Sequence, residues 1–240
     1  MSDLTRYSVI PDKFPREIVL LRGSGCKWKK CSFCDYHTDA SPDQEANYQL
    51  NREVLSHVTG AYHRLEAINS GSFPELDSRT MEELLRVCKE KDIREISFES
   101  HWMYRKKIPA LRKFFSEHGI SVFLKIGVET FDIAYREEIM HKGMGDVTPE
   151  EIAKYFDSTC LLFGLKGQTV DSMRRDIETG LAHFSRICIN IMVENTTSVK
   201  PDPDVIRSFL QELYPLYKEN DRVDILIDNT DFGVGGIDHA

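Results

Sequence analysis

Short apolar runs alternate with amphipathic stretches along most of the chain. Because a short apolar run bounded by turn residues is typical of a buried strand, we expect a strand at each run. Apolar residues at helical spacing between the runs predict helices. The expected strands cover 18–21, 66–69, 95–99, 121–128, 159–165, 187–193 and 223–227, and the expected helices cover 51–64, 80–88, 108–118, 133–140, 149–156, 170–184 and 203–217.

The regular alternation of strands and helices predicts an α/β fold with a parallel sheet and crossover helices. Thr80 and Thr148 stand where they can cap two of the helices. At about forty residues for each strand–helix unit, the length suits a partial (β/α)6 TIM-type barrel rather than a full barrel of eight units. We find no linker or low-complexity segment, so residues 1–240 are expected to form a single domain.

Polar residues follow every expected strand. Active sites of parallel α/β barrels lie at the carboxyl ends of the strands, so these residues mark a candidate pocket at the barrel mouth. In chain order they are Cys26, Cys31 and Cys34; Asn69, Ser70, Gly71 and Ser72; Glu99, Ser100 and His101; Glu129 and Thr130; Gly164 and Lys166; Glu194 and Asn195; and Asp228, Asn229 and Asp231.

Three cysteines in the loop 25–35 have the spacing C-x4-C-x2-C. Thiolates so close together either bind a soft metal or repel one another, and three of them leave one position of a four-coordinate centre open for chemistry. His37 extends the pattern, so a closed Cys3His zinc site is the structural alternative. A chain of 240 residues buries a core that folds without such a metal. The other cysteines, Cys88, Cys160 and Cys188, lie inside expected helices or strands and are expected to be buried apolar residues.

Composition and charge narrow the class of partner. The net charge is −8, and the basic residues are dispersed apart from Lys27, Lys29, Lys30 and the run 105–107. Proteins that bind RNA directly need a coherent basic face, so we expect a small-molecule substrate and no direct tRNA binding. The first 17 residues are polar, and no apolar run approaches membrane-spanning length. We therefore expect a cytoplasmic protein with reduced cysteines and no membrane partner.

The cysteine loop, with Phe33 directly before the last cysteine, resembles the cluster loop of radical S-adenosylmethionine (SAM) enzymes. The resemblance implies that Cys26, Cys31 and Cys34 are metal ligands and catalytic residues that hold a [4Fe-4S] cluster. SAM would bind the fourth iron. An electron donor of the flavodoxin or ferredoxin type would then drive cleavage of SAM to a 5'-deoxyadenosyl radical.

Further segments are similar to one branch of that superfamily, whose members act on tRNA or its modified bases. Residues 70–73 have its Gly-Ser-Phe version of a SAM-contacting Gly-Gly-Glu segment, and residues 127–130, 142–143 and 163–169 resemble other motifs of the branch. The resemblance implies that Ser70, Gly71 and Ser72 contact SAM, although Gly71 can also be a simple turn residue. Glu99 and Glu129 are candidate acceptors for the ribose diol of SAM, because carboxylates hold such diols in dinucleotide sites.

The C-terminal segment 223–240 is expected to bind the substrate. Its carboxylates, amide and aromatic ring suit the paired donors and the flat face of a guanine-like base, whereas a charged, glycine-rich terminal turn is the structural alternative. The candidate substrate residues are Asp228, Asn229, Asp231 and Phe232, together with His101.

The length, the Gly-Ser-Phe motif and the Asp-Phe-Gly-Val-Gly ending resemble the queuine lyase family. That resemblance implies release of the deazaguanine base queuine from queuosine 5'-phosphate, a small nucleotide. Two other hypotheses remain open at this stage. One is a radical SAM enzyme that modifies a tRNA base, similar to the archaeosine-forming relatives, and the other is a zinc-binding protein without enzymatic activity.

Overall fold

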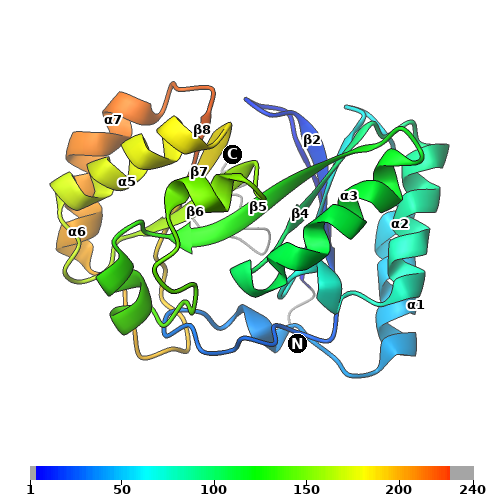
Figure 1. Ribbon diagram of the computed structural model, residues 1–240, viewed down its shortest axis with the longest axis horizontal. Helices are drawn as coiled ribbons and strands as arrows, with labels where there is room; N and C mark the ends of the chain where they lie inside the picture. Colours follow the sequence, from blue (N-terminus) through cyan, green and yellow to red (C-terminus); the bar gives the residue numbers. More distant parts are fainter. Residues whose placement is uncertain (1–3, 228–240) are drawn as a thin grey trace. The chain divides into compact units, whose positions relative to one another are not determined.

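The computed structural model describes residues 4–227, and the chain divides into two compact units. Unit 1 is built from Met1–Lys29 and Tyr36–Lys125, and unit 2 from Lys30–Asp35 and Ile126–Ala240. The strands are hydrogen-bonded in chain order from β1 to β8 (Figure 1). Strand β5, Ser121–Glu129, begins in unit 1 and ends in unit 2.

Unit 1 contains five successive strands. Strand β1, Tyr7–Ile10, runs antiparallel to β2, Arg16–Leu21. Strands β3, Arg64–Asn69, and β4, Glu95–Glu99, then continue in parallel to β5. The register pairs Leu21 of β2 with Asn69 of β3, so these two strands end side by side. Parallel pairing thus brings the loops after β2 and β3 to the same edge of the sheet.

The helices of unit 1 follow these strands. They are α1, Gln44–Leu55; α2, Ser78–Glu90; and α3, Ile108–Ser116, with short 3-10 helices at Tyr36–Thr38, Phe73–Glu75 and Trp102–Lys107. Helix α1 packs on β2 and on α2, as Figure 1 shows. The rings of Phe98 on β4 and Phe115 on α3 lie 5.7 Å apart, which anchors α3 to the strands.

The predicted helix over 51–64 is wrong in its bounds, because α1 covers Gln44–Leu55. It begins after Asp43, whose carboxylate caps the helix by accepting a hydrogen bond from Ala46 N. Its inward face carries the buried amides Asn47 and Asn51, which an apolar periodicity does not detect. No strand is predicted at Tyr7–Ile10, where the structure has β1. Helix α2 begins at Ser78 because Asp77, rather than Thr80, is its cap.

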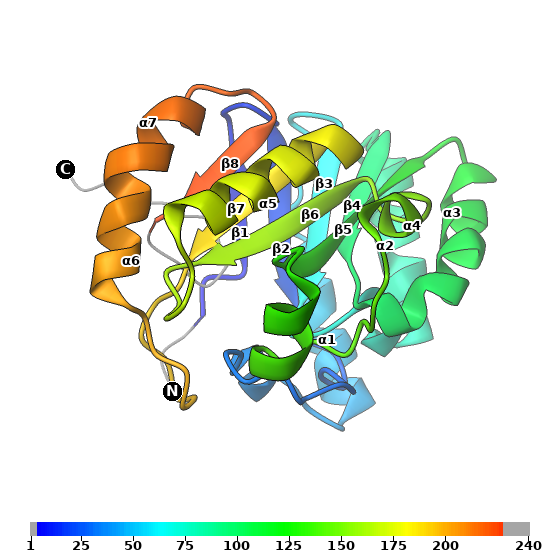
Figure 2. The same ribbon diagram turned by 60° about the vertical axis from the view of Figure 1, so that its left-hand side comes forward.

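Unit 2 contains the rest of β5 and three parallel strands. These are β6, Ser158–Phe163; β7, Arg186–Ile191; and β8, Val223–Leu226. Its helices are α4, Pro149–Ala153; α5, Val170–His183; α6, Pro203–Ser208; and α7, Tyr214–Tyr217, with π-helical segments at Tyr135–Ile139 and Phe209–Leu213 (Figure 2). The predicted cap Thr148 is confirmed, since its hydroxyl accepts a hydrogen bond from Glu151 N.

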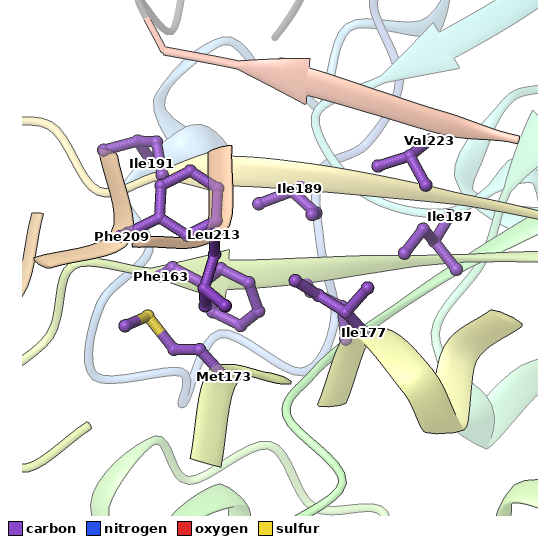
Figure 3. Close-up of a cluster of buried hydrophobic side chains, with 10 residues drawn as sticks. Phe163, Met173, Ile177, Ile187, Ile189, Ile191, Phe209, Leu213 and Val223 are labelled. Atoms are coloured by element: carbon purple, nitrogen blue, oxygen red, sulfur yellow. The ribbon is translucent and has the colours of Figure 1, made fainter. Parts of the chain in front are cut away.

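The core of unit 2 lies between these strands and helices (Figure 3). Alternate residues of β7, Ile187, Ile189 and Ile191, pack with residues of α5 and of the π-helical segment Phe209–Leu213. The residues between them therefore face the other side of the sheet. Helices cover one face, and Cys188 and Asn190 project from the opposite face.

The three cysteines outside the N-terminal loop are buried, as predicted. Cys88 is fully enclosed, and burial raises the pKa of its thiol to about 12. Cys160 and Cys188 are register partners on β6 and β7. Each behaves as a small apolar residue of its sheet or helix.

Candidate functional site

The predicted site residues are divided between the two units. Unit 1 contains Cys26, Ser70, Gly71, Ser72, Glu99 and His101, and unit 2 contains Cys31, Cys34 and Glu129. Asp228, Asn229, Asp231 and Phe232 lie outside the described residues.

A buried carboxylate that sequence reasoning missed organises the site of unit 1. Glu75 is 4% exposed, and its carboxylate accepts hydrogen bonds from Lys27 N (2.7 Å), Ser72 N (2.6 Å) and the Tyr104 hydroxyl (3.0 Å). Its backbone carbonyl accepts a further hydrogen bond from Ser24 N (3.0 Å). One residue thus joins the cysteine loop after β2 to the segment after β3.

The Ser-Gly-Ser segment packs directly on the cysteine loop. Cys26 N donates a hydrogen bond to Ser70 O (3.2 Å). A Cβ at Gly71 would overlap Glu75 Oε2 and lie 3.0 Å from Cys26 N. Gly71 is absent from the glycines with a positive φ in the described chain, so space rather than backbone conformation requires glycine here. The segment holds the backbone of the first predicted cluster ligand.

His101 is held by the same network. Its backbone N–H donates to Ser72 Oγ (2.9 Å), and its Nδ1 accepts from Met103 N (3.2 Å) as a helix cap. Its ring stacks on Trp28 of the cysteine loop, with the ring centroids 5.4 Å apart. These contacts give His101 a structural role, and its predicted substrate contact stays a prediction.

Tyr104 connects this network to the first cysteine. Burial, the Glu75 carboxylate and the Cys26 thiolate together raise the pKa of Tyr104. The phenol is therefore a hydrogen-bond donor throughout the physiological pH range. Tyr104 therefore donates a hydrogen bond to the Glu75 carboxylate beside Cys26.

Glu99 ends β4 within a group of charges. Lys125 Nζ lies 3.1 Å from Glu99 Oε1 and 2.6 Å from Glu66 Oε1, and Arg16 forms an ion pair with the other oxygen of Glu66. Burial by itself would raise the pKa of Glu66, but the two cations lower it to about 2. Glu99 is the most exposed member of this group, with 36% of its side chain accessible to solvent.

The second part of the cysteine loop is fixed in unit 2. Ser32 N donates to Met140 O (3.1 Å), Phe33 O accepts from Asn195 Nδ2 (2.7 Å), and Asp35 Oδ2 accepts from Thr196 N (3.0 Å). Phe33 belongs to a buried cluster against which Cys31 and Cys34 pack. Loops that follow β5 and β7 thus hold the two cysteines.

Glu129, at the end of β5, pairs with a buried lysine. Lys142 Nζ lies 2.7 Å from Glu129 Oε1 and 5.5 Å from the centre of the Phe33 ring. Burial favours neutral Lys142, but Glu129 and the thiolates of Cys31 and Cys34 raise its pKa, so it remains a cation. Glu129 also has a φ of 69°, a strained value for a residue with a side chain.

Two residues support this strained strand end. A Cβ at Gly127 would overlap Glu129 Oε1 and lie 3.1 Å from Lys142 Nζ, so glycine leaves the ion pair its space. Asp176 of α5 accepts a hydrogen bond from Phe131 N (2.7 Å) and holds the turn that follows Glu129. Burial raises the pKa of Asp176 to about 6, even though this hydrogen bond and one from Thr130 lower it.

The three loop cysteines have the donor chemistry of a metal site. None of the three forms a disulfide and all three are partly exposed, in contrast to the buried Cys88, Cys160 and Cys188. Sulfur donors of this kind suit an iron–sulfur cluster, and three thiolates leave one iron open. Within residues 4–227, no group of three or more His, Cys, Asp or Glu side chains is assembled for a metal ion. The ligand assignment therefore stays a prediction.

Comparisons with known proteins were made for the whole chain. No family model matches it, and no curated protein matches it. A solved structure of queuine lyase from Clostridium spiroforme bound to SAM and queuine is 43% identical, covers 98% of this chain and 100% of that chain, and has a TM-score of 0.92. A structure of methylornithine synthase is 14% identical, covers 82% of this chain and 62% of that chain, and has a TM-score of 0.49, which supports no argument.

The first of these structures confirms the predicted fold class, an α/β fold of the partial TIM-barrel type. In the described part of the chain, no helix is both long enough and apolar enough to cross a membrane.

The first prediction concerns Glu75. Glu75→Gln removes the negative charge and points an amide N–H₂ toward groups that are themselves donors. We expect urea unfolding of the metal-free protein to show a loss of about 1.5–3 kcal/mol, the range for charged hydrogen bonds. The matched control is Glu82→Gln on the exposed side of α2, which should change stability by less than about 0.5 kcal/mol. Equal stability of both variants would contradict this role.

The second prediction concerns Asp176 and pH. Its pKa rises from 3.8 to about 6 on folding, so the folded protein binds the extra proton and this stabilisation is lost as the pH rises from about 4 to about 6. Asp176→Asn stays neutral and keeps an acceptor for Phe131 N. The free energy of unfolding in urea is measured for Asp176→Asn and for wild type. The difference, variant minus wild type, should increase by about 2–3 kcal/mol from pH 4 to pH 7. A difference that is constant with pH would show an ordinary carboxyl group.

Proposed function

The chain belongs to the queuine lyase family of radical SAM enzymes, and we propose that it releases queuine from a queuosine nucleotide by radical SAM chemistry. The observation that carries this proposal is the match to queuine lyase over nearly the full length of both chains, at 43% identity. The match includes no large unmatched region in either chain.

The cysteine loop supplies the cofactor site in this proposal. Cys26, Cys31 and Cys34 would hold the [4Fe-4S] cluster, and the amino acid part of SAM would take the remaining iron. When bound, the cluster would supply the electron that cleaves SAM to a 5'-deoxyadenosyl radical. Glu75 positions the Cys26 loop, and Lys142 places a fixed positive charge near Cys31 and Cys34.

SAM recognition is proposed for the strand ends. Ser70 and Ser72 already use backbone groups to hold Cys26 and Glu75, so their contribution to SAM binding rests on the shape of the segment around Gly71. Glu99 is a partly exposed carboxylate, and a carboxylate suits a ribose diol. Glu129, in contrast, is buried and forms an ion pair with Lys142 through Oε1, so we assign a SAM contact there to its other oxygen, Oε2.

The proposed substrate contacts and partners rest on the sequence analysis. We propose that Asp228, Asn229, Asp231 and Phe232 recognise the deazaguanine base and that His101 contacts the substrate, on the sequence reasoning given above. The donor of the electron is a flavodoxin or ferredoxin type of protein. A cytoplasmic location suits a chain in which none of the six cysteines forms a disulfide. The net charge of −8 argues against direct tRNA binding.

The third prediction tests the function itself. The protein is reconstituted anaerobically with iron and sulfide, and is then incubated with SAM, a reductant and queuosine 5'-phosphate. We expect queuine and 5'-deoxyadenosine to form, and both to disappear in a variant with Cys26, Cys31 and Cys34 all changed to Ala. The matched control changes Cys88 to Ala in the hydrophobic core, and it should retain the brown cluster.

Three outcomes would decide between the hypotheses. A colourless protein that retains zinc would support the zinc-binding alternative. Turnover of a tRNA substrate with none of the nucleotide would support the tRNA-modifying alternative. SAM cleavage by the triple-cysteine variant would show that the cluster ligands are wrongly assigned.

The fourth prediction separates SAM binding from folding. Glu99→Gln should weaken SAM binding to the reconstituted protein by about 1.5–3 kcal/mol in isothermal titration, because a charged acceptor is lost, while urea unfolding changes little. Glu129→Gln should instead lower stability by about 3–5 kcal/mol, because it removes the negative charge that forms the buried ion pair with Lys142. Unchanged SAM affinity in Glu99→Gln would remove that residue from the SAM site.

A further inference from the structure

Two segments of unit 1 carry only positive charge. The chain has 39 acidic and 31 basic residues, yet residues 18–29 and 100–116 contain no Asp or Glu. The first segment contributes Lys27 and Lys29, and the second contributes the consecutive run Arg105, Lys106 and Lys107. In an acidic chain, such segments form a local field of opposite sign.

The two segments lie side by side in unit 1. Trp28, between the two lysines of the first segment, stacks on His101 at 5.4 Å, with 18° between the ring planes. Lys27 N and the Tyr104 hydroxyl both donate to the same oxygen of Glu75. The basic run therefore begins one residue after a side chain that is fixed to the cysteine loop.

The lysines of this surface are exposed and lack acidic partners. Lys27, Lys29, Lys106 and Lys107 are all exposed, and none of them forms an ion pair with any acidic side chain in the described part of the chain. Arg105 is partly buried over the Trp102 ring, at 4.6 Å from its centre. We call these five residues the basic surface.

The position of the basic surface indicates what it binds. It borders Cys26, which lies next to Tyr104 in the same network. The chain has no second cysteine-rich run that could hold another redox centre, so each electron must come from another molecule. Electron-transfer encounters use small, polar interfaces, and opposite charges raise their association rates by steering. A single phosphate group, in contrast, is bound by donors that converge on one point.

We propose that Lys27, Lys29, Arg105, Lys106 and Lys107 form the docking surface for an acidic one-electron carrier protein that holds a flavin or an iron–sulfur centre. The carrier loses one electron, and the cluster beside Cys26 gains it; no proton or group is transferred. This inference rests on the proposed function, since it requires a reducible cluster at the cysteine loop.

The experiment compares two variants with the same change of charge. Lys106→Glu/Lys107→Glu reverses two charges of the basic surface, and Lys89→Glu/Lys154→Glu reverses two exposed lysines elsewhere. Reduction of the reconstituted protein is followed by electron paramagnetic resonance after mixing with a reduced acidic flavodoxin, and separately with photoreduced 5-deazaflavin. Binding of oxidised flavodoxin is measured by titration at low and at high salt.

The basic-surface variant should bind flavodoxin at least tenfold more weakly at low salt and be reduced by it at least tenfold more slowly, with both differences shrinking at high salt. Reduction by deazaflavin should be the same in wild type and in both variants. Equal effects of the two variants would overturn the docking surface. A loss of affinity for queuosine 5'-phosphate with unchanged flavodoxin kinetics would also overturn it and would make the surface a phosphate site.

A failure of the proposed function would give different results from a failure of the docking surface. If reconstituted wild type showed no cluster signal with either reductant, the function would be wrong, and the docking surface would fall with it. If deazaflavin reduced all three proteins but flavodoxin did not bind wild type, only the docking surface would be wrong.

Discussion

The site of unit 1 depends on the hydrogen bonds that the buried carboxylate of Glu75 accepts. A buried charge is costly unless donors surround it, so the four-residue network of Lys27, Ser72, Tyr104 and Glu75 has one favourable arrangement. That arrangement fixes the loop that carries Cys26 against the segment around Gly71. In unit 2, the buried carboxylate of Glu129 is likewise satisfied, by the ion pair with Lys142 beside Cys31 and Cys34. In each unit, a satisfied buried carboxylate positions predicted cluster ligands.

The fold explains why these groups lie at strand ends. In unit 2, the apolar residues of β7 face the helices, so polar groups are confined to the opposite face and to the loops after the strands. Parallel pairing of β2 with β3 brings the cysteine loop beside the Ser-Gly-Ser segment. The sheet is therefore a rigid support, and the chemistry is assigned to loops. This division suits a family in which the cofactor supplies the reactive species and the protein orients it.

Much of the fold could be predicted from apolar runs, because most strands are buried and their residues are apolar. The prediction failed where buried groups are polar, as at Asn47 and Asn51 of α1 and at Arg16 and Glu17, which begin β2 before its apolar run. Within the site, Glu75 did leave a signal: Ser72 and Glu75 have the spacing of a capping box after a strand. Asp176 left none, since one acidic residue on an amphipathic helix is ordinary until its partner Phe131 N is known.

The most direct test of this account is electron paramagnetic resonance of the anaerobically reconstituted, chemically reduced protein, recorded with and without SAM. The account predicts the signal of a reduced [4Fe-4S] cluster that changes shape when SAM is added, because SAM binds the iron that the three cysteines leave open. The Glu82→Gln control should behave like wild type. A cluster signal that SAM leaves unchanged, or a protein that binds zinc and gives no signal, would contradict the account.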